Sequence, residues 1–393
     1  MSGRKPGARP VLIFAGFLLV GILVAALVIL QGRGAAPAKW TAPQKRTAGR
    51  EMSPVGAAGW WEVMFTDPLG LPAPDDPATQ VPAGSIEERL IARIGMAERS
   101  IHLACFEFNL TPIAAALVAA GKRGVEVRWV TDDEHGLDSD AEKGRGQFAL
   151  LRAAGIEVKS DTRSALMHDK FIVIDGTVVW TGATNLTVAG MFENDNNVIA
   201  IESPELAAIY EREFEEMWAG QFNAKSPSDR AAQSVTIGAT RIDALFSPED
   251  GAMSRIVPIV AGAKESIRIM AFSFTHEDLG AALLERHGAG IDTAVIFETR
   301  GSETKYSELP LLHNAGVPVR QDGNPSTFHH KVIVVDGRVT ITGSLNFSAN
   351  ADESNNENTL IIDDPEIASL YLREFDRCWA LGREPDPAKF AAR

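Results

Sequence analysis

The sequence predicts an α/β protein built from two similar mixed-sheet halves. Helix and strand patterns alternate along most of the 393 residues. Each half contains two strand-like runs joined by Asp-Gly, a strong hairpin signal. The interval in the chain between His168 and His329 recurs between Trp218 and Trp379. Because this interval stays constant from one pair to the other without a gap, we interpret the chain as a duplication.

The elements of the first half can be assigned in order. Residues 85–100 have apolar positions at helical spacing and begin with a Ser-x-x-Glu capping box at Ser85 and Glu88. Gly124 ends a second helix, and the hairpin turn falls at Asp175 and Gly176. The further expected elements are strands near 101–108, 125–130 and 156–158 and helices near 110–124, 148–155 and 203–220. We expect the strands to be buried between helices.

The composition divides the chain into five segments. Residues 11–30 are uncharged and almost entirely apolar, which is long enough to cross a bilayer core. We expect a single-pass membrane anchor with the catalytic region outside the cytoplasm; the alternative is a signal peptide cleaved after residues 36–38, which would give a secreted protein. The expected segments are 1–31 (cytoplasmic head and anchor), 32–59 (tether), 60–220 (first half), 221–242 (linker) and 243–393 (second half).

The charge balance argues against general binding of polyanions. The formal net charge is −14, so the surface as a whole does not attract nucleic acid or anionic lipid. The sequence contains no CxxC motif or histidine-rich cluster that would indicate a metal site. We therefore expect neither a metal nor a cofactor, and the sequence predicts no protein partner.

Two short motifs place basic side chains at the start of a strand. His168 and Lys170 are separated by one residue, as are His329 and Lys331, so each pair points to one face of its strand. A single histidine of this kind is usually structural. The repetition of the whole set at the same internal spacing instead indicates a functional site.

The hairpin brings further polar groups back to the same end of the sheet. The segments 182–185 (GATN) and 343–346 (GSLN) follow the second strand of each hairpin and return beside the histidine. Asp175 and Asp336 lie at the turn, off the histidine face, and are expected to hydrogen-bond local backbone. The candidate substrate-binding groups are Thr184, Asn185, Ser344 and Asn346.

A pair of opposed imidazoles suits phosphodiester cleavage by double displacement. One histidine attacks phosphorus, and the other protonates the leaving oxygen and then activates water or an alcohol. The lysines and asparagines would stabilise the charged transition state without a metal. The two halves, related by a pseudo-twofold axis, would place one histidine on each side of a shared groove.

These motifs resemble the phospholipase D superfamily, whose signature is H-x-K-x4-D followed by G-[ST]-x-N. The second half matches fully, whereas the first has Ala183 where the signature has Ser or Thr. The resemblance covers both halves of the chain and implies a phosphodiesterase or phosphatidyl transferase with a histidine nucleophile. The catalytic motif residues that it implies are His168, Lys170, Asp175, His329, Lys331 and Asp336.

The family also carries a carboxylate at a fixed interval downstream of each motif histidine. That position is Glu357 after His329 but Asn196 after His168. We expect each to lie behind the histidine of its own half. Since a carboxylate favours the protonated imidazole, we hypothesise that His168 is the nucleophile and His329 the general acid.

The substrate class is less sharply indicated. The expected anchor favours phospholipid head-group hydrolysis or transfer. A nuclease of the same superfamily is the alternative, with nucleic acid as a less favoured partner, because acidic runs replace the basic groove that it would need. Cardiolipin-synthase-like phosphatidyl transfer differs only in the acceptor alcohol. Loops 132–146 and 298–308 are expected to line the groove.

Overall fold

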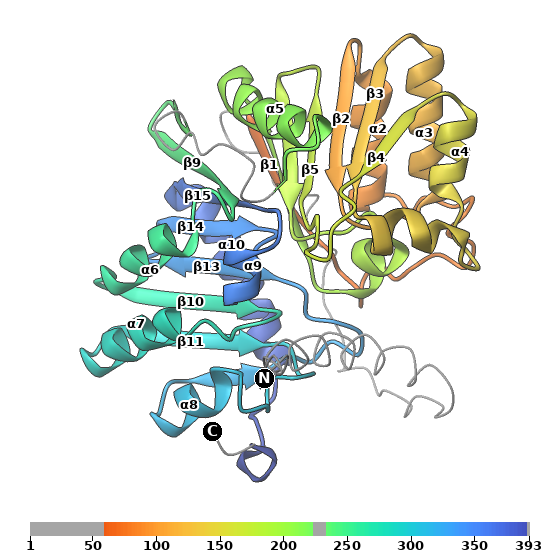
Figure 1. The fold of residues 1–393 in the computed structure, drawn as a ribbon. Coiled ribbons are helices and arrows are strands. Elements are labelled where there is room, and N and C mark those ends of the chain that lie inside the picture. The colour runs from red at the N-terminus through yellow and green to blue at the C-terminus, as the bar shows by residue number, and fades with distance from the viewer. Residues whose placement is uncertain (1–58, 223–232, 391–393) are drawn as a thin grey trace, which may run out of the picture. The chain divides into compact units, whose positions relative to one another are not determined.

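Two mixed β-sheets with the same strand order form the body of the protein (Figure 1). The computed structural model describes residues 59–222 and 233–390. The first sheet has the order β4-β3-β2-β5-β6-β7-β1, and the second has β12-β11-β10-β13-β14-β15-β9 with β8 added at its edge. In both, three strands at one end run parallel and the others antiparallel. The predicted α/β class with two similar mixed-sheet halves is confirmed.

The elements have the following bounds. The first sheet contains β1 (Trp61–Phe65), β2 (Ser100–Cys105), β3 (Glu126–Thr131), β4 (Glu157–Ser160), β5 (Lys170–Ile174), β6 (Val178–Gly182) and β7 (Asn197–Glu202). The second contains β8 (Ser234–Ile237), β9 (Thr240–Ser247), β10 (Ser266–Ala271), β11 (Asp292–Phe297), β12 (Val319–Gln321), β13 (Lys331–Val335), β14 (Val339–Gly343) and β15 (Glu357–Asp363). The helices are α2 (Ile86–Met96), α3 (Thr111–Lys122), α4 (Gln147–Ala153), α5 (Pro204–Trp218), α6 (Met253–Ala261), α7 (Glu277–Gly288), α8 (Leu309–Asn314), α9 (Ala349–Glu353) and α10 (Pro365–Leu381).

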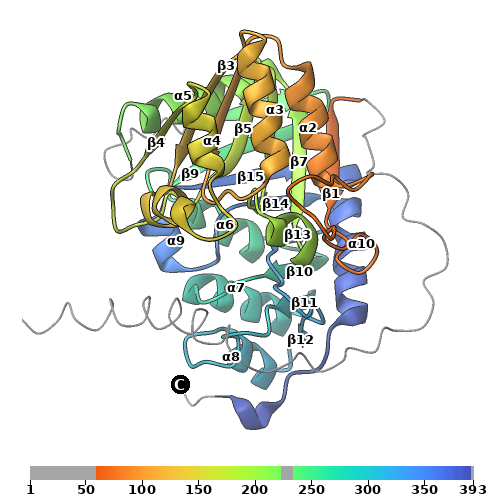
Figure 2. The same cartoon turned by 90° about the vertical axis from the view of Figure 1, so that its right-hand side faces the viewer.

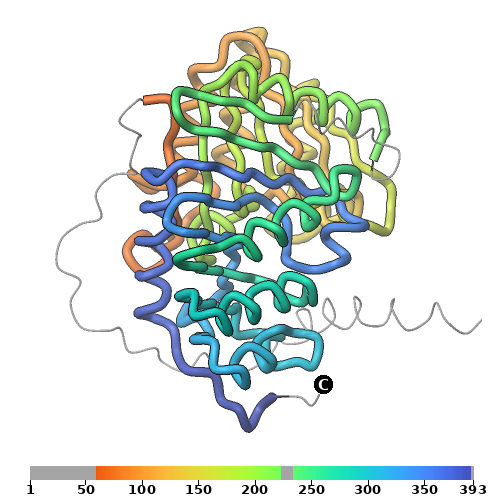
Figure 3. Tube along the Cα trace, turned by 90° about the vertical axis from the view of Figure 1, so that its left-hand side faces the viewer, coloured from red at the N-terminus to blue at the C-terminus, as the bar shows by residue number. Residues whose placement is uncertain are grey.

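Three hydrophobic clusters hold the layers together. One joins α2, α3 and α4 to a face of the first sheet, and another joins α6, α7 and α8 to a face of the second (Figures 1 and 2). The third, between them, combines α5 and α10 with strands of both sheets. Figure 3 follows the chain from the first half into the second. Because the third cluster draws on both sheets, the two halves share a core.

Local sequence signals explain two features that set the register. Ser85 caps α2 by accepting a hydrogen bond from the Glu88 backbone, and the Glu88 carboxylate accepts one from Gly84. At the hairpin between β5 and β6, Asp175 and Gly176 have φ angles of 54° and 60°. Two consecutive positive φ values define the tight turn whose twist matches antiparallel strands, which explains the Asp-Gly pair.

Part of the expected linker belongs to the second sheet. The expected linker at 221–242 contains β8 and the start of β9, which pair as a hairpin, so the second sheet begins earlier than predicted. Its residues 223–232, the expected tether and the expected anchor at residues 11–30 lie outside the described residues. Within the described residues, no helix is both long enough and apolar enough to span a bilayer.

Candidate active site

The two histidine–lysine pairs lie at equivalent ends of β5 and β13. Lys170 Nζ donates a hydrogen bond to the backbone oxygen of His168 at 2.6 Å, and Lys331 Nζ donates to that of His329 at 3.0 Å. Each of these four side chains is less than a tenth exposed. An ammonium has three protons, so each lysine keeps donors for another partner. The pairs therefore share a face, as the period-2 pattern predicts.

The halves exchange backbone hydrogen bonds beside each histidine. His168 N–H donates to the oxygen of Asn356 in the second half, and His329 N–H donates to the oxygen of Asp195 in the first; both distances are 2.9 Å. Short parallel bridges, Met167 with Asn356 and Asp195 with residue 328, extend these contacts. Each histidine is thus held against the opposite half, and the two are brought to one interface.

This exchange decides which group lies behind each imidazole. His168 Nδ1 lies 2.8 Å from a carboxylate oxygen of Glu357, and His329 Nδ1 lies 3.0 Å from Asn196 Oδ1. The expectation that each group serves the histidine of its own half is wrong. Glu357 follows Asn356, which is bonded to the first half, so its side chain reaches His168. The premise of the role assignment made from sequence therefore fails.

The partners also determine where each neutral imidazole carries its proton. Asn196 Nδ2 donates to the backbone oxygen of Gly190 at 3.0 Å, so its Oδ1 faces His329 and accepts the Nδ1 proton. The Glu357 carboxylate accepts the Nδ1 proton of His168 in the same way. In both rings Nε2 is then the atom with a free lone pair. Neither Nε2 has a hydrogen-bond partner within residues 59–222 and 233–390.

The hydroxyl groups of the two turns, expected to bind substrate, are hydrogen-bonded within the protein instead. Ser344 Oγ donates to Glu357 at 2.6 Å, and Asn355 Nδ2 donates to the same carboxylate at 3.2 Å. Thr184 Oγ1 donates to the backbone oxygen of Asn197. The assignment of Ser344 as a substrate-binding group is therefore corrected: its hydroxyl orients the carboxylate behind His168.

The two turn asparagines retain unused polar atoms. Asn185 Oδ1 and Asn346 Oδ1 are both buried, and neither has a hydrogen-bond partner among the residues that the structure describes. Each residue follows a strand, β6 or β14, whose last residues pair beside the histidine–lysine end of the hairpin. Buried amides normally satisfy their hydrogen bonds, so unsatisfied ones at a candidate site are available to a ligand.

The motif aspartates are not part of this cluster. Asp175 and Asp336 lie at the hairpin turns, at the opposite end of the strands from the lysines. Their carboxylates accept backbone N–H groups from chain segments that are distant in the sequence, not from local backbone as expected. Although burial acts to raise the pKa, these N–H groups lower the pKa of both aspartates. The donors are Glu98, Arg99 and Ser100 for Asp175, and Lys264, Glu265 and Ser266 for Asp336.

Burial and clustered positive charge dominate the electrostatics. Burial, with the charges of both lysines, holds the pKa of His168 and of His329 well below the usual value. Burial lowers the pKa of Lys170 to about 8, although Glu357 opposes the shift, and lowers that of Lys331 well below its usual range. Burial also raises the pKa of Glu357 to about 7. A surplus of buried donors and cations is suited to an anion.

Two aromatic side chains complete the cluster and were missed from the sequence. The Phe106 ring lies 4.9 Å from the His168 ring, with Lys170 Nζ 5.0 Å from its centroid. Phe272 packs in the same way on His329, at 4.9 Å. The signal was present, because the repeated strands SIHLACFEF and SIRIMAFSF place both phenylalanines at the same position. They exclude water on one side of each imidazole.

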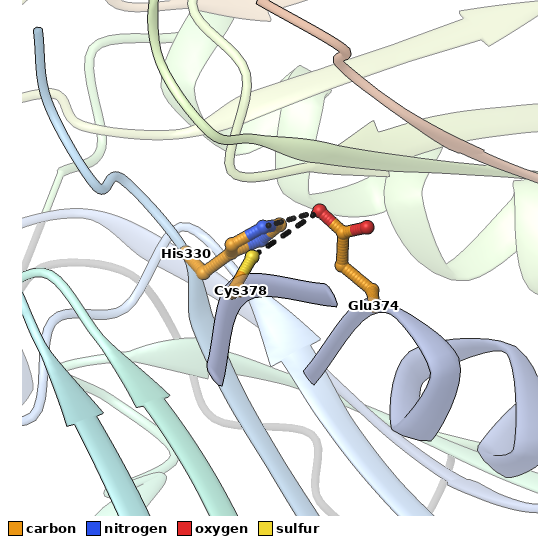
Figure 4. A group of neighbouring side chains, drawn as sticks. All are labelled: His330, Glu374 and Cys378. Carbon is orange, nitrogen blue, oxygen red and sulfur yellow. Dashed lines mark hydrogen bonds and ion pairs between the residues drawn. The ribbon is translucent and has the colours of Figure 1, made fainter. Parts of the chain in front are cut away.

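Three other groups in the described residues have side chains of metal-binding types. Figure 4 shows one group, in which the Glu374 carboxylate points toward the other two side chains. Arg377, which is not drawn there, donates to Glu374 at 2.6 Å, and the guanidinium groups of Arg128 and Arg163 contact carboxylates in the other two groups. A bound guanidinium therefore already neutralises one carboxylate in each group. We therefore assign no metal centre to them. The groups are His330 with Glu374 and Cys378, His102 with Glu211 and Glu215, and Asp132 with Asp133 and Asp161.

Comparisons with known proteins assign both halves of the chain to one family. The family described as "Cardiolipin synthase, PLD-like domain" matches residues 90–218 and 256–379, once in each half. The chain belongs to this phospholipase D-like family.

Individual relatives cover less of the chain. A mitochondrial cardiolipin hydrolase from Xenopus laevis is 40% identical over 141 residues, which are 36% of this chain and 66% of the relative. A phospholipase D from Rickettsia bellii is 32% identical over 136 residues, 35% of this chain and 68% of that protein. The phosphatidylserine synthase structure from Haemophilus influenzae matches 77% of this chain and 85% of its own, with 14% identity and a TM-score of 0.59, which supports the fold alone.

Proposed function

We propose that the protein is a phospholipase D-type phosphodiesterase that hydrolyses a phospholipid head group through a phosphohistidine intermediate. The observation that carries the proposal is the exchanged pairing of His168 with Glu357 and of His329 with Asn196. It leaves one free Nε2 on each histidine at the interface of the halves. The buried lysines supply hydrogen-bond donors for a phosphate diester, and the unsatisfied amides of the turns add further polar groups.

Because the carboxylate lies behind His168 and not behind His329, the reason taken from sequence no longer supports His168 as the nucleophile; the movement of charge during the reaction supports it instead. In the first step His168 Nε2 forms a bond to phosphorus, the bond from phosphorus to the leaving oxygen breaks, and His329 gives its proton to that oxygen. Positive charge thus passes from His329 to His168. Glu357 stabilises the cation that forms on His168, whereas the neutral amide of Asn196 retains the proton on His329 less strongly.

His329 takes up its proton when the substrate binds. Burial and the nearby lysines hold the pKa of the free His329 well below its usual value. A bound phosphodiester brings a negative charge that favours the protonated ring. In the second step water gives a proton to His329 while its oxygen displaces the phosphoryl group from His168. Each donor to the non-bridging oxygens is expected to contribute about 3 kcal/mol in the transition state.

The lipid assignment rests on the kinds of relatives found, because the acidic charge balance gives no general attraction to nucleic acid or to anionic lipid. The named relatives include a cardiolipin hydrolase and a phospholipase D. We extend the proposal to phosphatidyl transfer when an alcohol replaces water. Membrane attachment through residues 11–30 and a catalytic region outside the cytoplasm stay predictions.

The test uses the full-length chain in detergent micelles with EDTA present. We expect release of head group from phosphatidylglycerol, cardiolipin or phosphatidylcholine, and no cleavage of single-stranded DNA. Acid-quenched reactions with a phosphorus-labelled substrate should yield a labelled peptide that contains His168. Cleavage of DNA alone would reject the lipid assignment, and label on a peptide that contains His329 would reverse the two roles.

A further inference from the structure

A third imidazole lies next to the proposed nucleophile. The His135 ring lies 5.0 Å from the Phe106 ring, the same ring that packs against His168 at 4.9 Å. His135 is half-buried, and its ring has no hydrogen-bond partner in the described part of the chain. After burial and the two lysines, His135 is the next cause of the lowered pKa of His168. The His135 ring is therefore available to hydrogen-bond a bound substrate.

The position of His135 is fixed relative to His168 by a single carboxylate. Asp132 is 1% exposed and accepts the backbone N–H of His135 at 2.8 Å through one oxygen. Its other oxygen accepts the backbone N–H of Met167, the residue before His168, at 3.1 Å. The short π-helical turn at Asp133–Leu137, which carries His135, is therefore tied to the strand that carries the nucleophile. Such support favours a binding group over a mobile surface side chain.

The second half has the support but not the imidazole. Glu298 accepts the backbone N–H of Phe328, the residue before His329, at 2.6 Å, as Asp132 does for Met167. The residue three positions after Glu298 is Gly301, which has no side chain to offer. The third imidazole therefore belongs to the nucleophile's side alone. The two alcohol groups of an asymmetric phosphodiester would therefore have different surroundings in the site, one beside His168 and the other beside His329.

We propose that His135 binds an oxygen of the alcohol group that remains on phosphorus after head-group release. The inference rests on the proposed function, since it places the retained group beside His168 and the leaving group beside His329. For a phospholipid the retained group is a diacylglycerol, whose ester oxygens accept a hydrogen bond from the imidazole N–H. His135 is a substrate-binding residue and takes no part in bond cleavage.

The experiment compares variants at His135 in the full-length chain. His135→Phe keeps an aromatic ring against Phe106 but removes both nitrogens, whereas His135→Gln keeps an N–H donor. With dioctanoyl phosphatidylglycerol, His135→Phe should raise KM about tenfold with kcat within about threefold, and His135→Gln should restore most of the loss. With bis(p-nitrophenyl) phosphate, whose retained group lacks glycerol oxygens, KM should change less than about twofold for both. Cardiolipin, whose second phosphate leaves with the head group, should show the same change in KM as phosphatidylglycerol; a larger change would place His135 beside the leaving group and overturn the proposal.

A binding measurement makes the test independent of turnover. Calorimetry on the His168→Asn protein should show dioctanoyl phosphatidylglycerol bound about tenfold more weakly when His135→Phe is added. Equal dissociation constants would overturn the role of His135, whether or not the natural chain is an enzyme. A natural chain without phosphodiesterase activity that still shows the tenfold effect would instead overturn the proposed function alone.

Discussion

The same helix position has opposite electrostatic surroundings in the two halves. Glu374 of α10 contacts His330 and Arg377, whose charge and hydrogen bonds outweigh burial and hold its pKa far below the usual value. Its equivalent in the first half is Glu213 on α5, where burial and the neighbouring Glu249 and Asp169 raise the pKa well above the usual value. In the described part of the chain, neither oxygen of Asp169, the equivalent of His330, has a hydrogen-bond partner.

This contrast shows where a duplicated unit is free to diverge. The faces that carry His168 and His329 keep the same histidine, lysine and phenylalanine at equivalent positions. One residue further on, where the side chain points to the opposite face, the halves have Asp169 and His330. The proposed chemistry needs both copies of the first face, whereas the second face needs only to fold. The following predictions test that separation, beginning with the largest effect.

The largest predicted effect is the loss of lipid turnover when either histidine is replaced, and a second substrate distinguishes the roles of the two. His168→Ala should lower lipid turnover at least about 10⁴-fold, because no phosphoenzyme forms. His329→Ala should lower it about as much. With bis(p-nitrophenyl) phosphate, whose leaving group needs no acid, His329→Ala should release a rapid burst of one p-nitrophenolate per chain before slow turnover. Stopped-flow absorbance measures the burst, and a burst from His168→Ala instead would exchange the roles.

The next effect concerns the groups behind the imidazoles. Glu357→Gln should lower kcat about 10³-fold, because a neutral amide, whose oxygen can still accept the Nδ1 proton as that of Asn196 does, stabilises the cation on His168 much less than a carboxylate. The matched change in the other half, Asn196→Asp, should cost less than about tenfold, since His329 keeps an acceptor. Steady-state kinetics of both variants decide. Equal losses would show that the two partners are equivalent and remove the charge argument for His168.

The next prediction compares the stability of two variants, one altered at Glu374 and the other at Glu213. Glu374→Gln breaks a buried ion pair and should lower the free energy of unfolding at pH 7 by about 3 kcal/mol or more. Glu213→Gln replaces a carboxyl group whose raised pKa already disfavours charge, so the change should be neutral or stabilising. Urea denaturation of the two proteins measures the difference. Equal destabilisation would mean that Glu213 has a compensating partner.

The directions of the two pKa shifts also predict how the contributions of Glu374 and Glu213 to stability change with pH. Because the pKa of Glu374 is lowered on folding, its contribution to stability is present above the unfolded pKa and is lost as the pH falls through the folded value. Because the pKa of Glu213 is raised, its effect has the opposite sign, and stability falls as the pH rises above the unfolded value of about 4.5. Repeating the urea series at pH 5 should therefore narrow the gap between the two variants.

The smallest effect is the alkaline limb of activity. Lys170 has a pKa lowered to about 8, so kcat/KM should fall about tenfold per pH unit above that value as its charge is lost. Lys170→Arg keeps the charge and should move the limb to higher pH, although geometry will reduce the maximal rate. Pre-incubation and return to pH 7 controls for irreversible unfolding. An unchanged limb in Lys170→Arg would assign it to another group.

Periodic and local signals predicted much of the fold and the site. Alternation along β5 and β13 correctly placed each lysine beside its histidine, and the Asp-Gly turns were correct because few residues accept two positive φ angles. Phe106 and Phe272 were missed although the repeat aligns them, because a phenylalanine in a strand is usually interpreted as core. The start of the second sheet was also placed too late, since β8 has only 4 residues and gives a weak strand pattern.

Neither periodicity nor local motifs could predict the contacts across the pseudo-twofold axis. Spacing along the chain suggested Glu357 for His329, but the backbone bridge from residue 356 to residue 167 places it on His168. The same exchange made Ser344 a support for that carboxylate instead of a ligand for substrate.

The sequence by itself determined that there are two copies of one unit, which residues share each strand face, and which family the chain belongs to. These properties depend on neighbours within a short stretch of chain or on a repeated pattern. Only the tertiary structure decided which carboxylate serves which histidine and which buried acids are neutralised. The hydrogen bond between His168 and Glu357, which are far apart in the chain, depends on how two sheets dock, and no local pattern encodes that docking.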